Sequence, residues 1–271
     1  MIGIFGGSGF YSLLEGAKEK AVETPFGKTS SKITIGRIGN TDVAFMARHG
    51  TKHEYPPHKI PYKANVWAFK ELGVERIISP TAVGSLKPNV KPGEFLVPDQ
   101  FISFTHRDDS FYNGPEAEAT LGAKFGGTVH ISSAEPYCPE LIKIIVKEGR
   151  KMGLTVHDGG TLVVIQGPRF ASSAESDFFR RNEWDVINMT SYPELILARE
   201  LEMCYANIAI ITDYDTGLRD DPSIKPVTIE EIVRVFKQNN EKIKKLILDI
   251  IPKLPKERNC ICAKALEGAR P

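Results

Sequence analysis

The chain has 271 residues, with 35 lysines and arginines against 34 aspartates and glutamates, so its formal net charge is +1. Hydrophobic residues make up 41% and charged residues 25%, which is typical of a folded globular protein and excludes a disordered one. Balanced charge disfavours nucleic-acid binding, and no apolar run approaches the roughly 18 residues that cross a bilayer. Since the amino terminus also lacks the pattern of a secretory signal, we expect a cytoplasmic protein without nucleic-acid or membrane partners.

Short apolar runs alternate with segments of helical periodicity, which is the pattern of an α/β fold. Strands are predicted at 2–5, 43–47, 76–79, 161–165, 186–189 and 206–212. Helices are predicted at 62–72, 139–152, 171–182, 193–202 and 228–251. Thr228 is the expected N-cap of the last helix, with Glu231 in capping-box spacing. The apolar stripe of that helix comprises Ile229, Ile232, Val233, Phe236, Ile243, Leu246, Ile247 and Ile250.

Polar and glycine-rich segments follow several predicted strands at their carboxyl ends, where open α/β sheets bind ligands. The segment 3–10, GIFGGSGF, could hold an anion with backbone N–H groups and the Ser8 hydroxyl, or could be only a tight turn. Arg48 and His49 follow the second strand, where a guanidinium can grip a phosphate bidentately. The spacing of His49 and His53 would suit a metal ion on a helix, but the intervening glycine and the prolines that follow disfavour that helix.

Three further segments have the same position after a strand. The segment 79–85, SPTAVGS, is expected to be a loop with hydroxyl and glycine residues, and 186–191 supplies an asparagine and a threonine. Asp213 and Asp215 stand two residues apart after the last strand. Two neighbouring carboxyl groups suit general acid catalysis combined with hydrogen-bond acceptance, because one can stay protonated while the other ionises. A loop of solvated acids is the alternative interpretation.

Four cysteines are present, namely Cys138, Cys204, Cys260 and Cys262. They are too few for a disulfide scaffold, and their spacing is not that of a zinc site. Buried reduced thiols are one interpretation, and disulfides of the kind found in intracellular proteins of hyperthermophiles are the other. A low content of thermolabile amides, 10 Asn and 3 Gln, favours a thermophilic source.

Taken in order, ten segments across roughly residues 2–250 make the chain similar to the 5′-methylthioadenosine phosphorylases of the purine nucleoside phosphorylase superfamily. These segments are GIFGGSGF, TPFGKTS, ARHGTKH, PYKANVWAFKELG, TAVGSL, PGEFLVPDQFI, AEPYCP, GPRFASSAE, DVINMTSYPE and CYANIAIITDYD. The resemblance implies one α/β domain over 1–271, with a mixed central β-sheet flanked by helices and a tail at 252–271. The C-x-C of this tail resembles that of archaeal thermophilic members, which implies the disulfides Cys260–Cys262 and Cys138–Cys204.

The resemblance also implies a pentosyltransferase that converts methylthioadenosine and inorganic phosphate to adenine and 5-methylthioribose 1-phosphate, with no metal or organic cofactor. The phosphate ligands that it implies are Ser8, Arg48, His49, Thr81, Ala82 and Thr190. The implied ribose and purine contacts are Phe170, Ser172, Asn188, Met189, Asp213 and Asp215, with Asp213 as the general acid. A 5′-alkylthio pocket would be formed by Ile229, Ile232, Val233 and a neighbouring subunit's His130. The implied assembly is a homotrimer, or a homohexamer built as a dimer of trimers.

Three alternatives to this function are a broad-specificity purine nucleoside phosphorylase, a nucleosidase that uses water, and a nucleoside-binding module without activity. The first would also accept adenosine, inosine and guanosine. The Asp213 and Asp215 pair favours 6-amino purines, and the set of phosphate ligands disfavours hydrolysis. A binding module would need no general acid.

Overall fold

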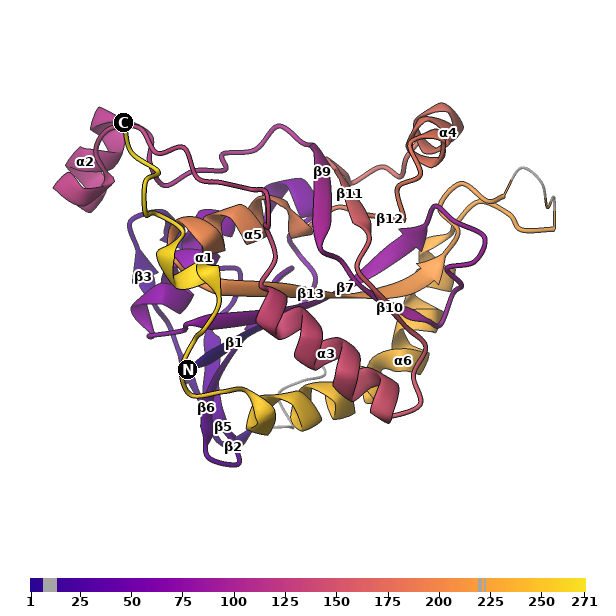
Figure 1. Ribbon diagram of the computed structural model, residues 1–271, viewed down its shortest axis with the longest axis horizontal. Helices are drawn as coiled ribbons and strands as arrows, with labels where there is room; N and C mark the ends of the chain where they lie inside the picture. Colours follow the sequence, from indigo (N-terminus) through magenta and orange to yellow (C-terminus); the bar gives the residue numbers. More distant parts are fainter. Residues whose placement is uncertain (7–13, 219–220, 222) are drawn as a thin grey trace.

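A computed structural model describes residues 1–6, 14–218, 221 and 223–271 (Figure 1). Over these residues the fold is built on an 11-stranded mixed sheet, with a short hairpin of β3 (Glu23–Thr24) and β4 (Gly27–Lys28) beside it. The strands of the large sheet are β1 (Ile2–Gly6), β2 (Glu15–Lys20), β5 (Ile33–Ile38), β6 (Thr41–Ala47), β7 (Arg76–Ser85), β8 (Phe95–Val97), β9 (Gln100–Phe104), β10 (Val156–Asp158), β11 (Thr161–Ile165), β12 (Val186–Asn188) and β13 (Cys204–Asp213).

The strands follow the order β10-β8-β13-β7-β1-β6-β5-β2. At the centre, β6, β1, β7 and β13 are parallel to one another. The far end of β7 pairs antiparallel with β12, and β11 and β9 extend the sheet from there in parallel. Because the central strands run the same way, their carboxyl ends lie at one edge of the sheet, where α/β folds bind ligands.

Helices cover both faces of this sheet, with α1 and α5 on one side and α3 and α6 on the other (Figure 1). The helices are α1 (Tyr62–Glu71), α2 (Pro115–Leu121), α3 (Pro139–Lys151), α4 (Ser173–Arg181), α5 (Ser191–Glu200) and α6 (Ile229–Ile250). Successive side chains of a strand point to opposite faces of the sheet, so each strand contributes to both hydrophobic layers. In β1, Ile4 packs with α3 and α6, and Phe5 packs with α1 and α5. Strands buried on both faces read as continuous apolar runs, which is why the sequence pattern revealed them. No described helix is long and apolar enough to span a membrane.

The predicted α/β class and mixed sheet are confirmed, and the predicted strands and helices correspond to elements within a few residues, except at the carboxyl end of β7. The segment 79–85 was wrongly predicted as a loop, because β7 continues through it to Ser85. Strand pairing with β13 and β12 holds this polar and glycine-containing segment extended, despite its weak strand propensity. Seven strands of the described chain were not predicted, namely β2, β3, β4, β5, β8, β9 and β10. Two of them, β8 and β10, have three residues each, and the residues of β2 are all exposed.

The amino-terminal third of α6 differs from the predicted core stripe. Thr228 is the N-cap, and its hydroxyl accepts a hydrogen bond from the backbone of Glu231. The buried positions of the helix are Val235, Asn239, Ile243, Leu246, Ile247 and Ile250. Ile229 and Val233 are instead 59% and 42% exposed, because the first turns of α6 extend past the packed layer. These turns border the cavity described next.

Candidate active site

A cavity of about 990 Å³ lies at the carboxyl ends of the central strands. It extends from Gly6 at the end of β1, past β6, β7, β12 and β13, to the first turns of α6. Thirteen of the predicted site residues line it, namely Arg48, His49, Thr81, Ala82, Phe170, Asn188, Met189, Thr190, Asp213, Asp215, Ile229, Ile232 and Val233. The structure thus brings together, in one cavity, residues that the sequence distributes over six segments.

Arg48 lies immediately after β6 and is 4% exposed. Its Nε and Nη2 atoms donate to the two carboxylate oxygens of Glu194, at 2.7 and 3.1 Å. Nη2 also donates to Ser79 at 2.5 Å, and Nη1 donates to the carbonyl of Pro80 at 3.4 Å. Burial lowers the pKa of Arg48, but Glu194 outweighs burial and leaves that pKa raised. Arg48 therefore binds Glu194 bidentately, and among the described residues four of its five N–H groups have acceptors, which leaves one for a ligand.

His49 is held as a neutral ring beside Arg48. Its Nδ1 lies 2.9 Å from the carbonyl oxygen of Tyr55, so Nδ1 carries the hydrogen, and the ring stacks on His53 at 4.5 Å. Burial, followed by the charge of Arg48, lowers the pKa of His49 to about 4. At neutral pH the ring therefore has Nε2 free as a hydrogen-bond acceptor and adds no positive charge to the cavity.

The hydroxyl group of Thr81 is fixed by two asparagines. The amide nitrogens of Asn207 and Asn188 lie 3.0 and 3.3 Å from Thr81 Oγ1. Asn207 also donates to the carbonyl of Ser79 at 2.8 Å, which ties β13 to β7 below the cavity. Thr81 Oγ1 also lies 3.2 Å from Asn207 Oδ1, to which it can donate, so the two buried asparagines hold the hydroxyl in a fixed position.

Asp213 ends β13 and is 5% exposed. Its Oδ2 accepts a hydrogen bond from Thr212 Oγ1 at 2.7 Å, and its Oδ1 accepts one from the backbone of Asp215 at 2.7 Å. A Cβ on Gly84 would lie 2.9 Å from Oδ1, so a glycine is required at this point of β7. Burial raises the pKa of Asp213 to about 6, against the opposing effect of these hydrogen bonds. A carboxyl group with such a pKa is suited to donate a proton near neutral pH.

Asp215 is 3% exposed and has a φ of +53°. Burial is the main reason that its pKa is raised. Its Oδ2 atom has no hydrogen-bond partner within hydrogen-bonding distance among the described residues, although the nearby Ser176 and Arg180 oppose the rise of this pKa. A buried carboxylate oxygen without a partner is costly, which indicates that it accepts a hydrogen bond from a ligand in the cavity.

The part of the cavity wall that α6 forms begins with apolar side chains, and Lys237 and Asn240 follow them along the helix. These apolar side chains are those of Ile229, Ile232, Val233 and Phe236. Phe170, which is 39% exposed, borders the cavity from the segment between β11 and α4. Exposed apolar side chains around a concave site suit an apolar group of a ligand.

Three predicted site residues do not line the cavity of the described chain. Ser172 is the N-cap of α4, where its hydroxyl and Glu175 form a complete capping box. This hydroxyl accepts from the backbone of Glu175 and keeps its own hydrogen to donate, so its predicted purine contact stays a prediction. His130 is exposed, and its backbone N–H donates to the carbonyl of Ala269 at 2.8 Å, so its predicted role in a neighbouring subunit stays a prediction. Ser8 lies outside the described residues.

Two residues that shape the site, Glu194 and Asn207, were not predicted from the sequence. Glu194 is 1% exposed and also accepts hydrogen bonds from Ser79 and Tyr205, at 2.8 and 2.9 Å. Asn207 is fully buried within β13. Both are polar residues inside apolar runs, which was the available signal, since buried polar groups need specific partners.

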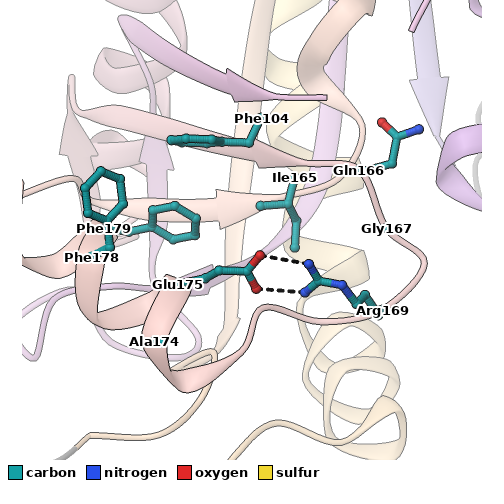
Figure 2. Close-up of a pocket in the computed structure, with 9 residues that line it drawn as sticks. All are labelled: Phe104, Ile165, Gln166, Gly167, Arg169, Ala174, Glu175, Phe178 and Phe179. Carbon is teal, nitrogen blue, oxygen red and sulfur yellow. Dashed lines mark hydrogen bonds and ion pairs between the residues drawn. The ribbon is translucent and has the colours of Figure 1, made fainter. Parts of the chain in front are cut away.

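A second, smaller pocket of about 350 Å³ adjoins the site at Ile165, which lines both cavities (Figure 2). In Figure 2 the phenylalanines of its wall gather on one side, and Arg169 and Glu175 form a bidentate ion pair on the other. Phe104 and Phe178 are 43% and 46% exposed. This pocket contains none of the predicted site residues.

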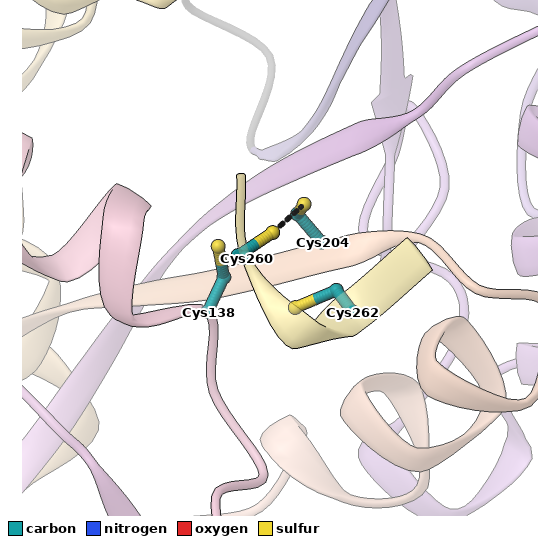
Figure 3. A group of neighbouring side chains, drawn as sticks. All are labelled: Cys138, Cys204, Cys260 and Cys262. Carbon is teal, nitrogen blue, oxygen red and sulfur yellow. Dashed lines mark hydrogen bonds between the residues drawn. The ribbon is translucent and has the colours of Figure 1, made fainter. Parts of the chain in front are cut away.

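The four cysteines converge in one cluster at the start of α3, the start of β13 and the carboxyl-terminal segment (Figure 3). Their sulfur atoms all lie within 4.8 Å of one another. The thiols are free in the structure, and Cys204 Sγ lies 3.4 Å from Cys260 Sγ. The expected pairs Cys138–Cys204 and Cys260–Cys262 are thus not formed here, and the cysteines are one cluster rather than two separate pairs. Four such thiols could also hold a metal ion, an arrangement that their spacing in the sequence did not suggest.

Comparison with known proteins agrees with this fold and site. The model of the phosphorylase superfamily matches residues 1–252. The S-methyl-5′-thioadenosine phosphorylase of Pyrococcus furiosus is 49% identical over 267 residues, which cover 98% of this chain and 97% of that protein. The 6-oxopurine nucleoside phosphorylase of the same organism is 49% identical over 270 residues, which cover 99% of this chain and 98% of that protein. The structure of methylthioadenosine phosphorylase from Schistosoma mansoni with adenine is 31% identical, with a TM-score of 0.90 over 99% of this chain and 98% of that one.

The chain therefore belongs to the phosphorylase superfamily and is an enzyme. Within that superfamily it is similar, over nearly the full length, to the archaeal methylthioadenosine phosphorylases, as the ten segments indicated. Its identity to the two Pyrococcus furiosus enzymes is equal, although their names give different substrates. Sequence identity over the whole chain therefore does not indicate which purine the enzyme accepts. That preference has to be inferred from the residues of the site.

Proposed function

We propose that this enzyme cleaves S-methyl-5′-thioadenosine with inorganic phosphate, giving adenine and 5-methylthioribose 1-phosphate. The observation that carries the proposal is the pair of buried acids, Asp213 and Asp215, in the same cavity as Arg48, His49 and Thr81. One end of this cavity offers a protonatable group and an acceptor for a purine. The other end offers donors for an anion.

Phosphate would bind between Arg48, Thr81 and the segment at Ala82 and Thr190. Because Glu194 already compensates the charge of Arg48, the phosphate would depend on single N–H and hydroxyl donors more than on net positive charge. Neutral His49 would accept a hydrogen bond from a phosphate hydroxyl through Nε2. The hydroxyl of Ser8 is proposed as a further donor, on the sequence resemblance.

The nucleoside would extend from the acids toward the phosphate, with its base beside Phe170 and its ribose over Met189 beside Asn188. A methylthio group is apolar, and the surface that Ile229, Ile232 and Val233 present to the cavity suits such a group better than a hydroxyl. His130 of a neighbouring subunit would complete this part of the cavity in a trimer or a dimer of trimers.

In the proposed reaction the bond from C1′ to purine N9 breaks, and its electron pair moves into the purine. Asp213 donates its proton to purine N7, so that adenine leaves uncharged. A phosphate oxygen attacks the cation-like C1′ from the opposite face, which inverts that carbon. The phosphate anion also stabilises the developing positive charge on the ribose.

The second candidate function is a purine nucleoside phosphorylase that also accepts 6-oxo purines. It is favoured by the 49% identity to the 6-oxopurine enzyme of Pyrococcus furiosus. The unpartnered Oδ2 of Asp215 weighs against it, because an acceptor suits the 6-amino group of adenine and would face the oxygen of a 6-oxo purine. Such a mismatch costs about 1–3 kcal/mol.

Phosphate-dependent cleavage of methylthioadenosine, adenosine and inosine, measured side by side, tests both candidates. We expect kcat/KM for methylthioadenosine to be the highest and that for inosine to be lower than that for adenosine by about 5- to 150-fold, as the mismatch at Asp215 predicts. An inosine value equal to that of adenosine would select the broad-specificity enzyme. Adenine release without phosphate would identify a nucleosidase, and binding without turnover would identify a binding module.

We further predict that the cysteine cluster becomes two disulfides, Cys138–Cys204 and Cys260–Cys262, in the purified enzyme. The first would close a loop of about 66 residues, worth about 4 kcal/mol in the chain-entropy account. A reductant should therefore lower the melting temperature by roughly 10 °C. Cys138→Ser should remove most of this response, whereas Cys262→Ser should retain it. Four thiols that titrate in denaturant without reductant, or stoichiometric zinc in the purified protein, would contradict the prediction.

A further inference from the structure

Arg107 lies outside the cavity, yet its guanidinium joins three segments that form the cavity wall. It follows β9 and is half-buried. Its Nη2 donates to the carbonyl oxygens of Gln166 and Met189, at 2.8 and 2.9 Å. Its Nη1 donates to the carbonyl of Tyr192 at 2.5 Å and to the hydroxyl of Tyr62 at 3.1 Å.

Each of these acceptors belongs to a different part of the site. Gln166 follows β11 and begins the segment that leads to Phe170, and Met189 follows β12 and lines the cavity. Tyr192 lies two residues before Glu194, which holds Arg48. The segments also touch one another, because the space beside Gly167 is filled by the sulfur of Met189, 2.6 Å from where a Cβ would lie.

Tyr62 extends the same connection to a fourth segment. Its hydroxyl accepts from Arg107 and donates to the carbonyl of Pro57 at 2.9 Å, and Pro57 lines the cavity in the segment that includes His49. The guanidinium also lies 5.2 Å from the centre of the Tyr62 ring, a cation–π distance. One side chain thus connects the segments that carry the proposed sugar, purine and phosphate contacts.

The charge of Arg107 is balanced by backbone dipoles. In the described part of the chain it forms no ion pair, and its Nε has no hydrogen-bond partner. Burial lowers the pKa of Arg107, which agrees with a cation held mainly by carbonyl groups. A lysine cannot reproduce these contacts, because an ammonium group lacks the planar, forked arrangement of donors.

We infer that Arg107 is a positioning residue for the phosphorolysis proposed above, and that it fixes the sugar-binding Met189 relative to the phosphate and purine ends of the cavity. The inference rests on the proposed function. Its contacts end at carbonyl groups of the cavity segments and at Tyr62, so its removal frees those segments while the sheet hydrogen bonds remain. The phosphate oxygen and C1′ are then no longer held at a fixed distance and angle. The chemical step depends on this alignment more than substrate binding does, so kcat should fall more than KM rises.

The test compares Arg107→Ala and Arg107→Lys with Arg258→Ala as the matched control. Arg258 is another half-buried arginine that donates to a backbone carbonyl, that of Glu202 at 2.6 Å, away from the cavity. At saturating phosphate and methylthioadenosine, we expect Arg107→Ala to lower kcat by about 100-fold and KM to change by only a few-fold. Added methylguanidinium should restore at least about tenfold of that loss, and Arg258→Ala should keep the wild-type kcat.

Several results would overturn the inference. One is a wild-type kcat in Arg107→Ala; another is a loss of kcat in both alanine variants that follows their fraction unfolded. If Arg107→Ala does not fold, Arg107→Lys decides, with an expected loss of about tenfold in kcat at an unchanged melting temperature, and a wild-type kcat overturns the inference. Failure of the proposed function itself would look different, because the wild-type enzyme would then not cleave methylthioadenosine with phosphate.

Discussion

Replacing Asp213 with asparagine is expected to lower kcat for phosphorolysis by about 10²–10⁴-fold while KM changes little, because asparagine cannot supply a proton to the leaving purine. The substitution preserves the local hydrogen bonds. The asparagine oxygen can accept from the backbone of Asp215, and its amide can donate to Thr212, whose hydroxyl can donate to the carbonyl of Val83. Steady-state kinetics with saturating phosphate measures the effect.

The pH dependence gives an independent check on Asp213. Because its pKa is raised to about 6, the fraction of enzyme that carries the catalytic proton falls as pH rises through 6. We therefore expect kcat/KM to decrease on the alkaline side of this pH in the wild-type enzyme, and this limb to be absent from the residual activity of Asp213→Asn.

In Asp213→Asn, the thermal stability should be preserved or increased above about pH 6, although kcat is lowered. A carboxyl group whose pKa is raised by folding contributes stability that is fully present below its unfolded value, about 4, and lost as pH rises through about 6. Above that pH, Asp213→Asn should therefore unfold at a temperature no lower than the wild type. Asp215→Asn serves as the neighbouring control, with a change in the preference between adenosine and inosine expected. An unchanged kcat in Asp213→Asn would mean that Asp213 is not the acid.

The second large effect is expected for Glu194→Gln, which should lower the free energy of unfolding by about 3–5 kcal/mol. Both partners of the ion pair are buried, with side-chain exposures of 4% for Arg48 and 1% for Glu194. A glutamine at this position would turn an amide donor toward the donors of Arg48 and leave its charge uncompensated. Chemical denaturation measures the stability, and the KM for phosphate should rise in the same variant because Arg48 loses its fixed orientation.

Glu175→Gln is the matched control for Glu194→Gln. Glu175 also binds an arginine bidentately, with Arg169 at 2.7 and 2.8 Å, but this pair lies at the surface. Exposed ion pairs contribute little, so the loss should be about 1 kcal/mol or less, and the KM for phosphate should not change. If both variants lost the same free energy of unfolding, burial of the Arg48 and Glu194 pair would make no contribution to stability beyond that of an exposed pair.

The position of the site was predictable from the sequence because strand ends are visible in it. Apolar runs buried on both faces identify β1, β6, β11 and β13, and the residues just beyond them collect at one edge of a parallel sheet. Arg48 and Asp213 were found in this way, and the similarity to a known family assigned their roles. Two stretches of strand could not be predicted because their local patterns are weak. All residues of β2 are exposed, and β7 continues through residues of low strand propensity.

Periodicity and motif order are properties of the chain, and they indicate the α/β class, the family and the segments that form the site. Which side chains contact one another across the site can be seen only in the tertiary structure. It paired Arg48 with Glu194 across 146 positions of sequence, made Ser172 a helix cap, and joined four cysteines into one cluster. Hydrogen bonds and desolvation depend on distances of a few ångströms between residues far apart in the chain, and no local pattern encodes these distances.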